Sequence, residues 1–315
     1  MAAIAPTAGT IVVEKKRRPF LVELLIRLVK EKPLGTVGGA IVLIFFLVGI
    51  FANFLAPYGY NQMVLSARLH APSATHLLGT DNLGRDMLSR IIYGARISMI
   101  VGVCVPAIGI TLNVILGVIS GYFGGWVDLL IQRLVDTVMC FPSLVIMLTI
   151  VAITGPGLVQ VVLILGILGG IGGGVRVARS AVMGVKQNVF VEASRAIGCS
   201  NSRIMWRHIF PNIMPVVIIG FSLTMGGAIL AEATLSFLGF GIPPPMPSWG
   251  GMLSGPSRIY MLEAPWMALW PGVALSLVVY GMNMLGDALR DLLDPRLRGG
   301  LGRYGRKVSL KKAES

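Results

Sequence analysis

Charged residues are scarce in this chain. Only 13% of its 315 residues are Asp, Glu, Lys or Arg, whereas 55% are hydrophobic. Soluble domains are about 25% charged on average, so this composition excludes an ordinary water-soluble fold. The mean hydropathy of +0.79 indicates instead that a lipid bilayer is the solvent of this protein.

The short motifs that accompany catalysis are also missing. The sequence has no G-x-x-x-x-G-K-[ST] phosphate loop, no H-E-x-x-H zinc motif and no G-x-S-x-G nucleophile. It has three cysteines and three histidines, and none has metal-ligand spacing. We therefore predict that the chain is not an enzyme, has no catalytic residues and binds no metal or cofactor itself.

Long apolar runs predict six transmembrane helices. Each run free of charge exceeds the about 20 residues that cross a bilayer. The run 137–175 is long enough for two helices, and Gly155-Pro156-Gly157 at its centre predicts a tight hairpin. The expected fold is an all-α polytopic membrane protein, with spans near 37–56, 97–120, 134–154, 158–180, 213–234 and 266–290.

The distribution of basic residues predicts the orientation of these spans. An even number of spans places both termini on one side, and that side holds 22 Lys and Arg against five on the other. Because Lys and Arg are enriched in cytoplasmic loops, both termini are predicted to be cytoplasmic. The net charge of +13 is then a topology signal, and we expect no nucleic-acid partner.

Four regions follow from this topology. The cytoplasmic tail 1–36 contains an amphipathic pattern over 19–32, which either lies on anionic lipid or acts as a juxtamembrane stop signal. The first helix and an external segment occupy 37–95. A five-helix core with a cytoplasmic loop at 181–213 occupies 96–293, and a basic cytoplasmic tail occupies 294–315.

Several local features carry their own expectations. Thr80 or Asp81 is expected to cap an interfacial helix that precedes the second span. Glycines at 166–174 indicate either tight helix packing or a flexible segment lining a path. The six prolines of 236–265 exclude a regular helix and suit either contact with a partner or a re-entrant scoop. We expect three carboxylates to lie near span ends, within reach of water: Asp136, Glu232 and Asp287.

Ionisable groups are otherwise nearly absent from the spans. A carrier driven by an ion gradient usually needs such groups at the membrane midplane. The energy for any transport is therefore expected to enter elsewhere.

The loop 181–213 has a helical pattern of its own. An exposed apolar face is predicted from Val189, Ala193, Ala196 and Ile197. Glu192 and Arg195 are spaced to form an ion pair, and Gly198 can end the helix in the left-handed conformation. A second stretch, 202–210, is expected to break at Pro211 before the fifth span.

This loop resembles the signature of a known family, the inner-membrane permease subunits of binding-protein-dependent ABC importers. That signature reads E-A-A, three residues, G, nine residues, then I-x-L-P. The matching positions are Glu192, Ala193, Gly198 and Pro211, and the departures are Ser194, His208 and Phe210. The segment RHIFPN at 207–212 is similar to the R-H-I-L-P-N of the peptide-importer branch.

Three further segments resemble the dipeptide, oligopeptide and nickel permease group, and its C-type subunit most closely. They are LGTD followed by GRD within 78–86, LSFLGFGIPPPMPSWGG at 235–251 and NMLGDALRDLLDPRLR at 283–298. Together with the loop, these matches span most of residues 76–298.

The resemblance implies a type I ABC importer permease fold in the plasma (inner) membrane of a prokaryote. It implies a homologous permease partner, two cytoplasmic ATPases that would hold ATP and Mg, and an external solute-binding protein, besides the membrane lipids. The loop would dock on an ATPase. The expected coupling residues are Glu192, Ala193, Ser194, Ala196, Ile197, Gly198 and Pro211.

The same resemblance favours di- or oligopeptides as the transported solute. Nickel or another small solute carried by the same machinery is the alternative, and an ion-coupled secondary transporter is a third hypothesis. The sequence does not indicate which residues contact the solute.

Overall fold

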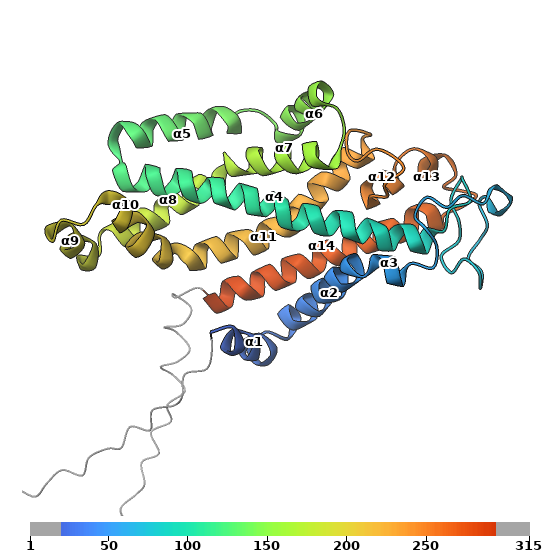
Figure 1. Cartoon of the computed structure of the whole chain (residues 1–315), viewed down its shortest axis with the longest axis horizontal. Coiled ribbons are helices and arrows are strands. Elements are labelled where there is room, and N and C mark those ends of the chain that lie inside the picture. The colour runs from blue at the N-terminus through green and yellow to red at the C-terminus, as the bar shows by residue number, and fades with distance from the viewer. Residues whose placement is uncertain (1–19, 294–315) are drawn as a thin grey trace, which may run out of the picture.

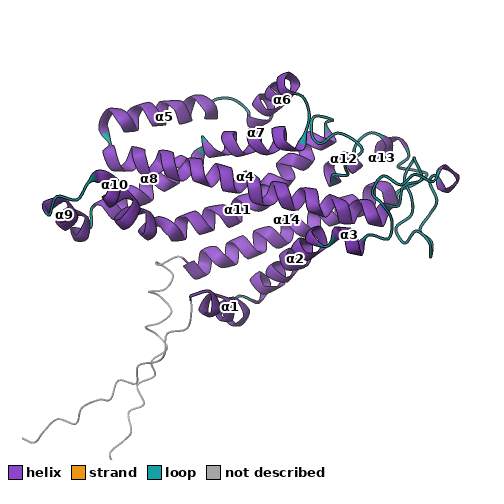
Figure 2. Cartoon of the chain, viewed as in Figure 1, coloured by secondary structure: helices purple, strands orange, loops and turns teal. Residues whose placement is uncertain are grey.

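The computed structural model describes residues 20–293, and within them the chain is a bundle of helices without strands (Figure 2). Four helices are long and apolar enough to cross a membrane: α2 (Pro33–Ile50), α4 (Met87–Phe123), the continuous helix Asn201–Phe237 and α14 (Trp266–Leu293). Two bent helix pairs meet the same test, which makes six spans if each pair counts as one. They are α5 (Gly125–Met139) with α6 (Ser143–Thr154), and α7 (Leu158–Gly170) with α8 (Gly173–Lys186).

The predicted hairpin at Gly155-Pro156-Gly157 is confirmed, because α6 ends at Thr154 and α7 begins at Leu158. The span predicted at 134–154 is not one continuous helix but part of a bent pair, α5 and α6. The chain bends by 84° between α5 and α6, where Pro142 sits at the N-cap of α6 and cannot donate to the preceding turn.

The helix expected to lead into the second span is present, but its predicted cap at Thr80 or Asp81 is wrong. Asp86, and not Thr80 or Asp81, is the N-cap of α4, and its side chain accepts a hydrogen bond from the Ser89 amide. The helix then runs without interruption through the predicted span to Phe123. The capped start and the membrane span are therefore one rigid element.

Short helices complete the two ends of the bundle. At one end lie α9 (Val189–Ala196) and α10 (Asn201–Ile204), and at the opposite end lie α12 (Trp249–Leu253) and α13 (Pro256–Ile259) (Figure 1). The proline-rich segment contains only these last two helices, as its composition predicts. The remaining elements are α1 (Phe20–Glu31), α3 (Ala52–Leu55), the 3-10 turn η1 (Leu65–Ala67), the π-helix η2 (Met205–Ile209) and α11 (Phe210–Phe237).

Glycines bring α7 and α8 against α4. A Cβ added at Gly166 would lie 2.8 Å from Ile108 Cβ, and one at Gly170 would lie 2.7 Å from Leu112 Cβ. One at Gly174 would lie 2.4 Å from the Asn113 side chain. Tight packing is therefore the role of Gly166, Gly170 and Gly174, as expected for helices that pack within a membrane. Gly169 has nothing within 4 Å, and the chain bends by 44° between α7 and α8.

The expectations for the three carboxylates divide. Asp136 ion-pairs with Arg176, and Asp287 is exposed, so both reach water or a partner. Glu232 is 0% exposed, and the prediction that it reaches water is wrong. It is covered because the segment 239–252 folds back against the end of α11.

Candidate functional site

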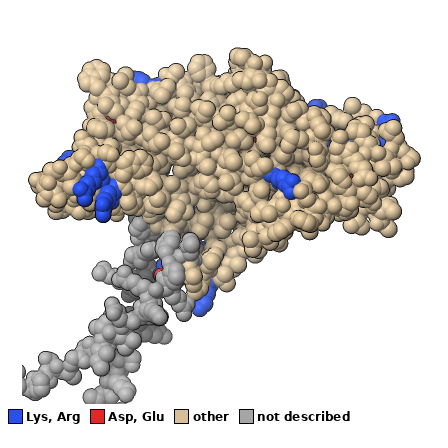
Figure 3. Space-filling model, in the orientation of Figure 1, with Lys and Arg blue, Asp and Glu red and all other residues tan. Residues whose placement is uncertain are grey.

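The first candidate site is the end of the bundle that carries α9. A short turn after α8 leads into α9, which runs for eight residues, and a second turn leads into α10. In Figure 1 this segment projects beyond the ends of α4, α5 and α11. Figure 3 shows Lys and Arg side chains gathered at this end of the molecule.

The apolar face predicted for α9 is exposed, as expected. Val189 is 79% and Ile197 is 80% exposed, and Ala193 and Ala196 are exposed with them. The opposite face is inserted into the bundle end, where Val191 is wholly buried. An apolar helix face of this kind, turned away from its own protein, fits the groove of a partner.

The end of α9 follows the predicted glycine turn. Gly198 has φ of +79°, and its amide donates to the Arg195 carbonyl at 2.9 Å. The next amide, that of Cys199, donates to the Ser194 carbonyl at 3.0 Å. These bonds satisfy carbonyls that a helix end otherwise leaves unpaired, and they fix the direction of the chain after the helix.

Tyr122, in the last turn of α4, holds α9 in place. Two cations lie over its ring, with Lys186 Nζ 5.7 Å and Arg195 Cζ 5.3 Å from the ring centre. The Tyr122 hydroxyl donates to Asn201 Oδ1 at 2.7 Å, and its carbonyl accepts a hydrogen bond from Lys186 Nζ at 2.6 Å. Four contacts from three elements therefore converge on one residue, which is 4% exposed.

The expected ion pair between Glu192 and Arg195 is wrong. Arg195 lies over Tyr122 instead, and Glu192 is exposed and forms no ion pair within residues 20–293. Ser194 is buried, and its hydroxyl donates to the Phe190 carbonyl at 2.7 Å.

The break expected at Pro211 is wrong as well. The helix continues through it, and the five-residue π-helix η2 precedes it. The amide of Phe210 reaches back to the Met205 carbonyl, which is one residue further than in an α-helix. Because proline lacks an amide and its ring crowds the preceding turn, a local π-turn lets the helix pass it.

The structure thus groups most of the predicted coupling residues. Glu192, Ala193, Ser194 and Ala196 lie on α9, and Ile197 and Gly198 form its end. Pro211 lies apart, on the exposed first turn of α11. The role of Tyr122 could not be predicted from the sequence, because its partners Lys186 and Asn201 lie 64 and 79 residues later in the chain.

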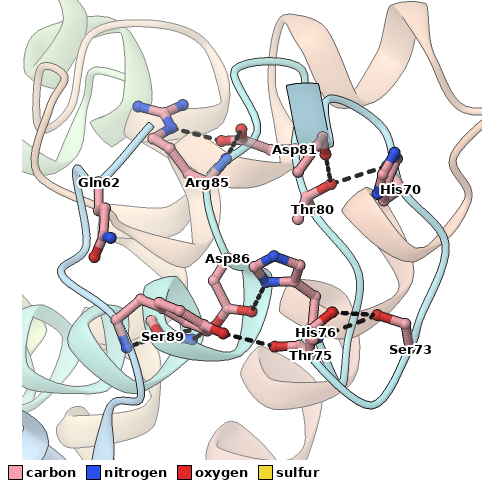
Figure 4. Close-up of polar contacts among 12 residues, drawn as sticks. Gln62, His70, Ser73, Thr75, His76, Thr80, Asp81, Arg85, Asp86 and Ser89 are labelled. Carbon is pink, nitrogen blue, oxygen red and sulfur yellow. Dashed lines mark hydrogen bonds and ion pairs between the residues drawn. The ribbon is translucent and has the colours of Figure 1, made fainter. Parts of the chain in front are cut away.

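At the opposite end, the LGTD and GRD motif forms a buried polar network (Figure 4). Asp81 Oδ2 accepts a hydrogen bond from Arg85 Nε at 2.7 Å. Asp86 accepts two bonds from Ser89, and its Oδ1 lies 3.0 Å from His76 Nδ1. The network fixes the loop that starts α4, so the motif has a structural role that its sequence alone did not reveal.

The short helix α12 is wedged beside this network. Trp249 is buried, and its Nε1 donates to the Ile91 carbonyl on α4 at 3.0 Å. Gly250 lies so close to α11 that a Cβ there would be 2.2 Å from the Ala233 carbonyl oxygen. On α11, the Ser236 hydroxyl donates to Glu232 Oε1 at 2.6 Å.

These observations define a multi-pass helical membrane protein with a projecting apolar helix at one end of its bundle. The chain belongs to the family of binding-protein-dependent transport system inner membrane components, whose model matches residues 113–299. A second model, the N-terminal TM domain of oligopeptide transport permease C, matches residues 23–72. The protein is therefore an inner-membrane permease of the peptide-transporter group.

Three relatives illustrate this membership. The dipeptide transport system permease protein DppC of Alkalihalophilus pseudofirmus is 43% identical over 85% of this chain and 88% of its own length. The glutathione transport system permease protein GsiD of Pectobacterium atrosepticum is 38% identical over 83% and 86%. The probable D,D-dipeptide transport system permease protein DdpC of Escherichia coli is 38% identical over 87% and 92%.

Proposed function

We propose that this chain is the transmembrane permease subunit of an ATP-driven importer of di- or oligopeptides. With a homologous permease it forms the translocation path, and an external binding protein delivers the peptide. The observation that carries the proposal is α9, a helix whose apolar face is exposed and whose base is clamped by Tyr122. Two separate ATPases bind ATP and Mg, and their movement reaches the chain at α9.

The arrangement of α4 supports this transmission. Tyr122 is in the last turn of α4, a helix of 37 residues, and the Asp86 cap is at its other end. At 1.5 Å per residue the helix is about 55 Å long, more than the thickness of a bilayer. A displacement of α9 therefore acts directly on an element that crosses the whole protein.

The proposed orientation places α9 and both termini in the cytoplasm. The excess of Lys and Arg on that side supports it, since the count is 22 against five. The α12 end then faces outward, where the binding protein docks.

Peptides are favoured over other solutes by the relatives. Three of them are named for dipeptide, D,D-dipeptide and glutathione transport, and all three solutes are short peptides. Nickel or another small solute is the alternative cargo for the same machinery, and an ion gradient is the alternative energy source.

Reconstitution tests the proposal. The chain is purified with its permease partner and the two ATPases, placed in liposomes and supplied with the binding protein and a labelled dipeptide. The expected result is ATP hydrolysis stimulated by the loaded binding protein, with dipeptide uptake that needs ATP. Uptake driven by a proton or sodium gradient without ATP, or uptake of Ni²⁺ in place of the dipeptide, would overturn it.

A further inference from the structure

A cleft of about 260 Å³ opens at the α12 end of the molecule. Its walls come from the start of α4, the tip of the hairpin between α6 and α7, and the segment 239–257. The charged residues that line it are Asp81, Arg85 and Arg90. This volume suits one end of a short peptide.

Two guanidinium groups in the cleft wall share one carboxylate. Asp81 Oδ2 lies 2.7 Å from Arg85 Nε and 3.7 Å from Arg90 Nε. Both arginines are more than nine-tenths buried, at 9% and 8% exposed. Glu232 accepts a hydrogen bond from the lining residue Ser236, but it is wholly buried and does not line the cleft. The two arginines and one aspartate of the lining therefore give the cleft wall a net charge of +1.

The terminal nitrogens of Arg85 are available to a ligand. Its Nε is engaged by Asp81, whereas neither Nη atom donates a hydrogen bond to any residue within 20–293. Figure 4 shows the dashed contact from the Arg85 side chain to Asp81 and none from the two terminal nitrogens. Their planar pair of N–H donors matches the two oxygens of a carboxylate, and burial strengthens such a charge-assisted contact.

We infer that Arg85 binds the C-terminal carboxylate of the peptide in this cleft, with Arg90 supplying the additional positive charge. The inference rests on the proposed function, because it names the substrate group that the permease itself contacts. A free carboxylate is common to short peptides of any side-chain composition. This site therefore selects for a peptide end and leaves the choice of sequence to other contacts.

Direct binding tests the inference without ATP or a binding protein. The assembled permease–ATPase complex in lipid nanodiscs is titrated with alanyl-phenylalanine and with its C-terminal amide, and binding is followed by saturation-transfer NMR. We expect the amide to bind at least about tenfold more weakly, since hydrogen bonds to charged groups contribute about that much. The variant Arg85→Gln should lower the affinity for the acid by the same factor and leave the amide unchanged.

A matched control and a second arm distinguish the outcomes. Arg68→Gln removes an arginine of the same loop region that does not line the cleft, and it should leave both affinities unchanged. Equal binding of acid and amide to the unaltered protein would overturn the inference, even if Arg85→Gln does not fold. Weaker docking of the ligand-free binding protein to Arg85→Gln, with unchanged peptide binding, would also overturn it, because Arg85 would then pair with an acidic side chain of that protein.

The two proposals fail in different ways. If the dipeptide is imported with ATP but acid and amide bind equally, the proposed function stands and the carboxylate site falls. If no ATP-driven uptake occurs, the proposed function falls whatever the binding preference.

Discussion

The guanidinium of Arg195 lies over the ring of Tyr122, with Cζ 5.3 Å from the ring centre. Arg195 belongs to the exposed helix α9, and Tyr122 belongs to the last turn of α4. The contact therefore joins α9, whose apolar face is exposed, to α4, which runs from one end of the bundle to the other. A cation over an aromatic face contributes about 0.5–2 kcal/mol, depending on how far it is removed from water.

Arg195→Ala should loosen α9 without preventing insertion of the protein. The ring contact contributes about 0.5–1 kcal/mol at this partly exposed position. Its loss therefore raises the equilibrium constant for local opening of α9 a few-fold. We expect faster amide hydrogen exchange in 189–196 and more ATP hydrolysed per peptide imported. Arg203→Ala is the control, because Arg203 stacks on no aromatic ring of the described residues. Equal exchange in wild type and Arg195→Ala would contradict a clamp at Tyr122.

Gly198→Ala should destabilise the end of α9 through the backbone alone. A Cβ at this position meets nothing within 4 Å, but φ is +79°, where a residue with a side chain costs about 1–2 kcal/mol. Gly184→Ala is the matched control, since Gly184 lies inside α8 with equally open space. There the change to alanine should stabilise the helix by about 0.5–1 kcal/mol. Thermal unfolding in detergent should shift in opposite directions, and a shift of the same sign would argue against the turn geometry.

Features set by neighbouring residues could be predicted from the sequence. The exposed face of α9, the turn at Gly198 and the hairpin at Gly155-Pro156-Gly157 all depend on spacing within about ten residues, and the structure confirms them. Each follows from helical periodicity or from the conformational preference of glycine and proline.

Features set by distant residues could not be predicted. Nothing near Glu232 in the sequence shows that α12 covers it, because α12 follows 17 residues later and packs through Gly250. Arg195 does not pair with Glu192 as expected, because it lies over the ring of Tyr122, which is more than 70 residues earlier in the chain. Pro211 was interpreted locally as a helix breaker, whereas packing of the long helix preserves it through a π-turn.

Glu192→Lys should leave the protein inserted and folded but weaken its binding to the ATPases. Glu192 is exposed in the first turn of α9, where a carboxylate stabilises the helix by only about 0.3–1 kcal/mol. The main effect is therefore reversal of charge on the proposed docking surface. We expect reduced co-purification of the ATPases and loss of uptake, as we do for Gly198→Asp. Glu263→Lys, an exposed charge reversal at the other end, should retain the ATPases, and normal uptake by Glu192→Lys at normal expression would rule out this role.

Gly250→Ala should displace α12 from the bundle. The new Cβ would lie 2.2 Å from the carbonyl oxygen and 2.4 Å from the Cα of Ala233, so main chain rather than a flexible side chain must move. Overpacking of this kind costs about 1–3 kcal/mol. Movement of α12 also pulls Trp249 away from the Ile91 carbonyl and exposes a buried ring. We expect a lower midpoint of thermal unfolding and faster hydrogen exchange in 248–253.

Gly227→Ala, on α11 with nothing within 4 Å of its Cβ, should leave both measurements at wild-type values or slightly stabilise the protein. Equal behaviour of the two variants would mean that α12 is not held by backbone contact, and the α12 end of the bundle would then be mobile rather than fixed.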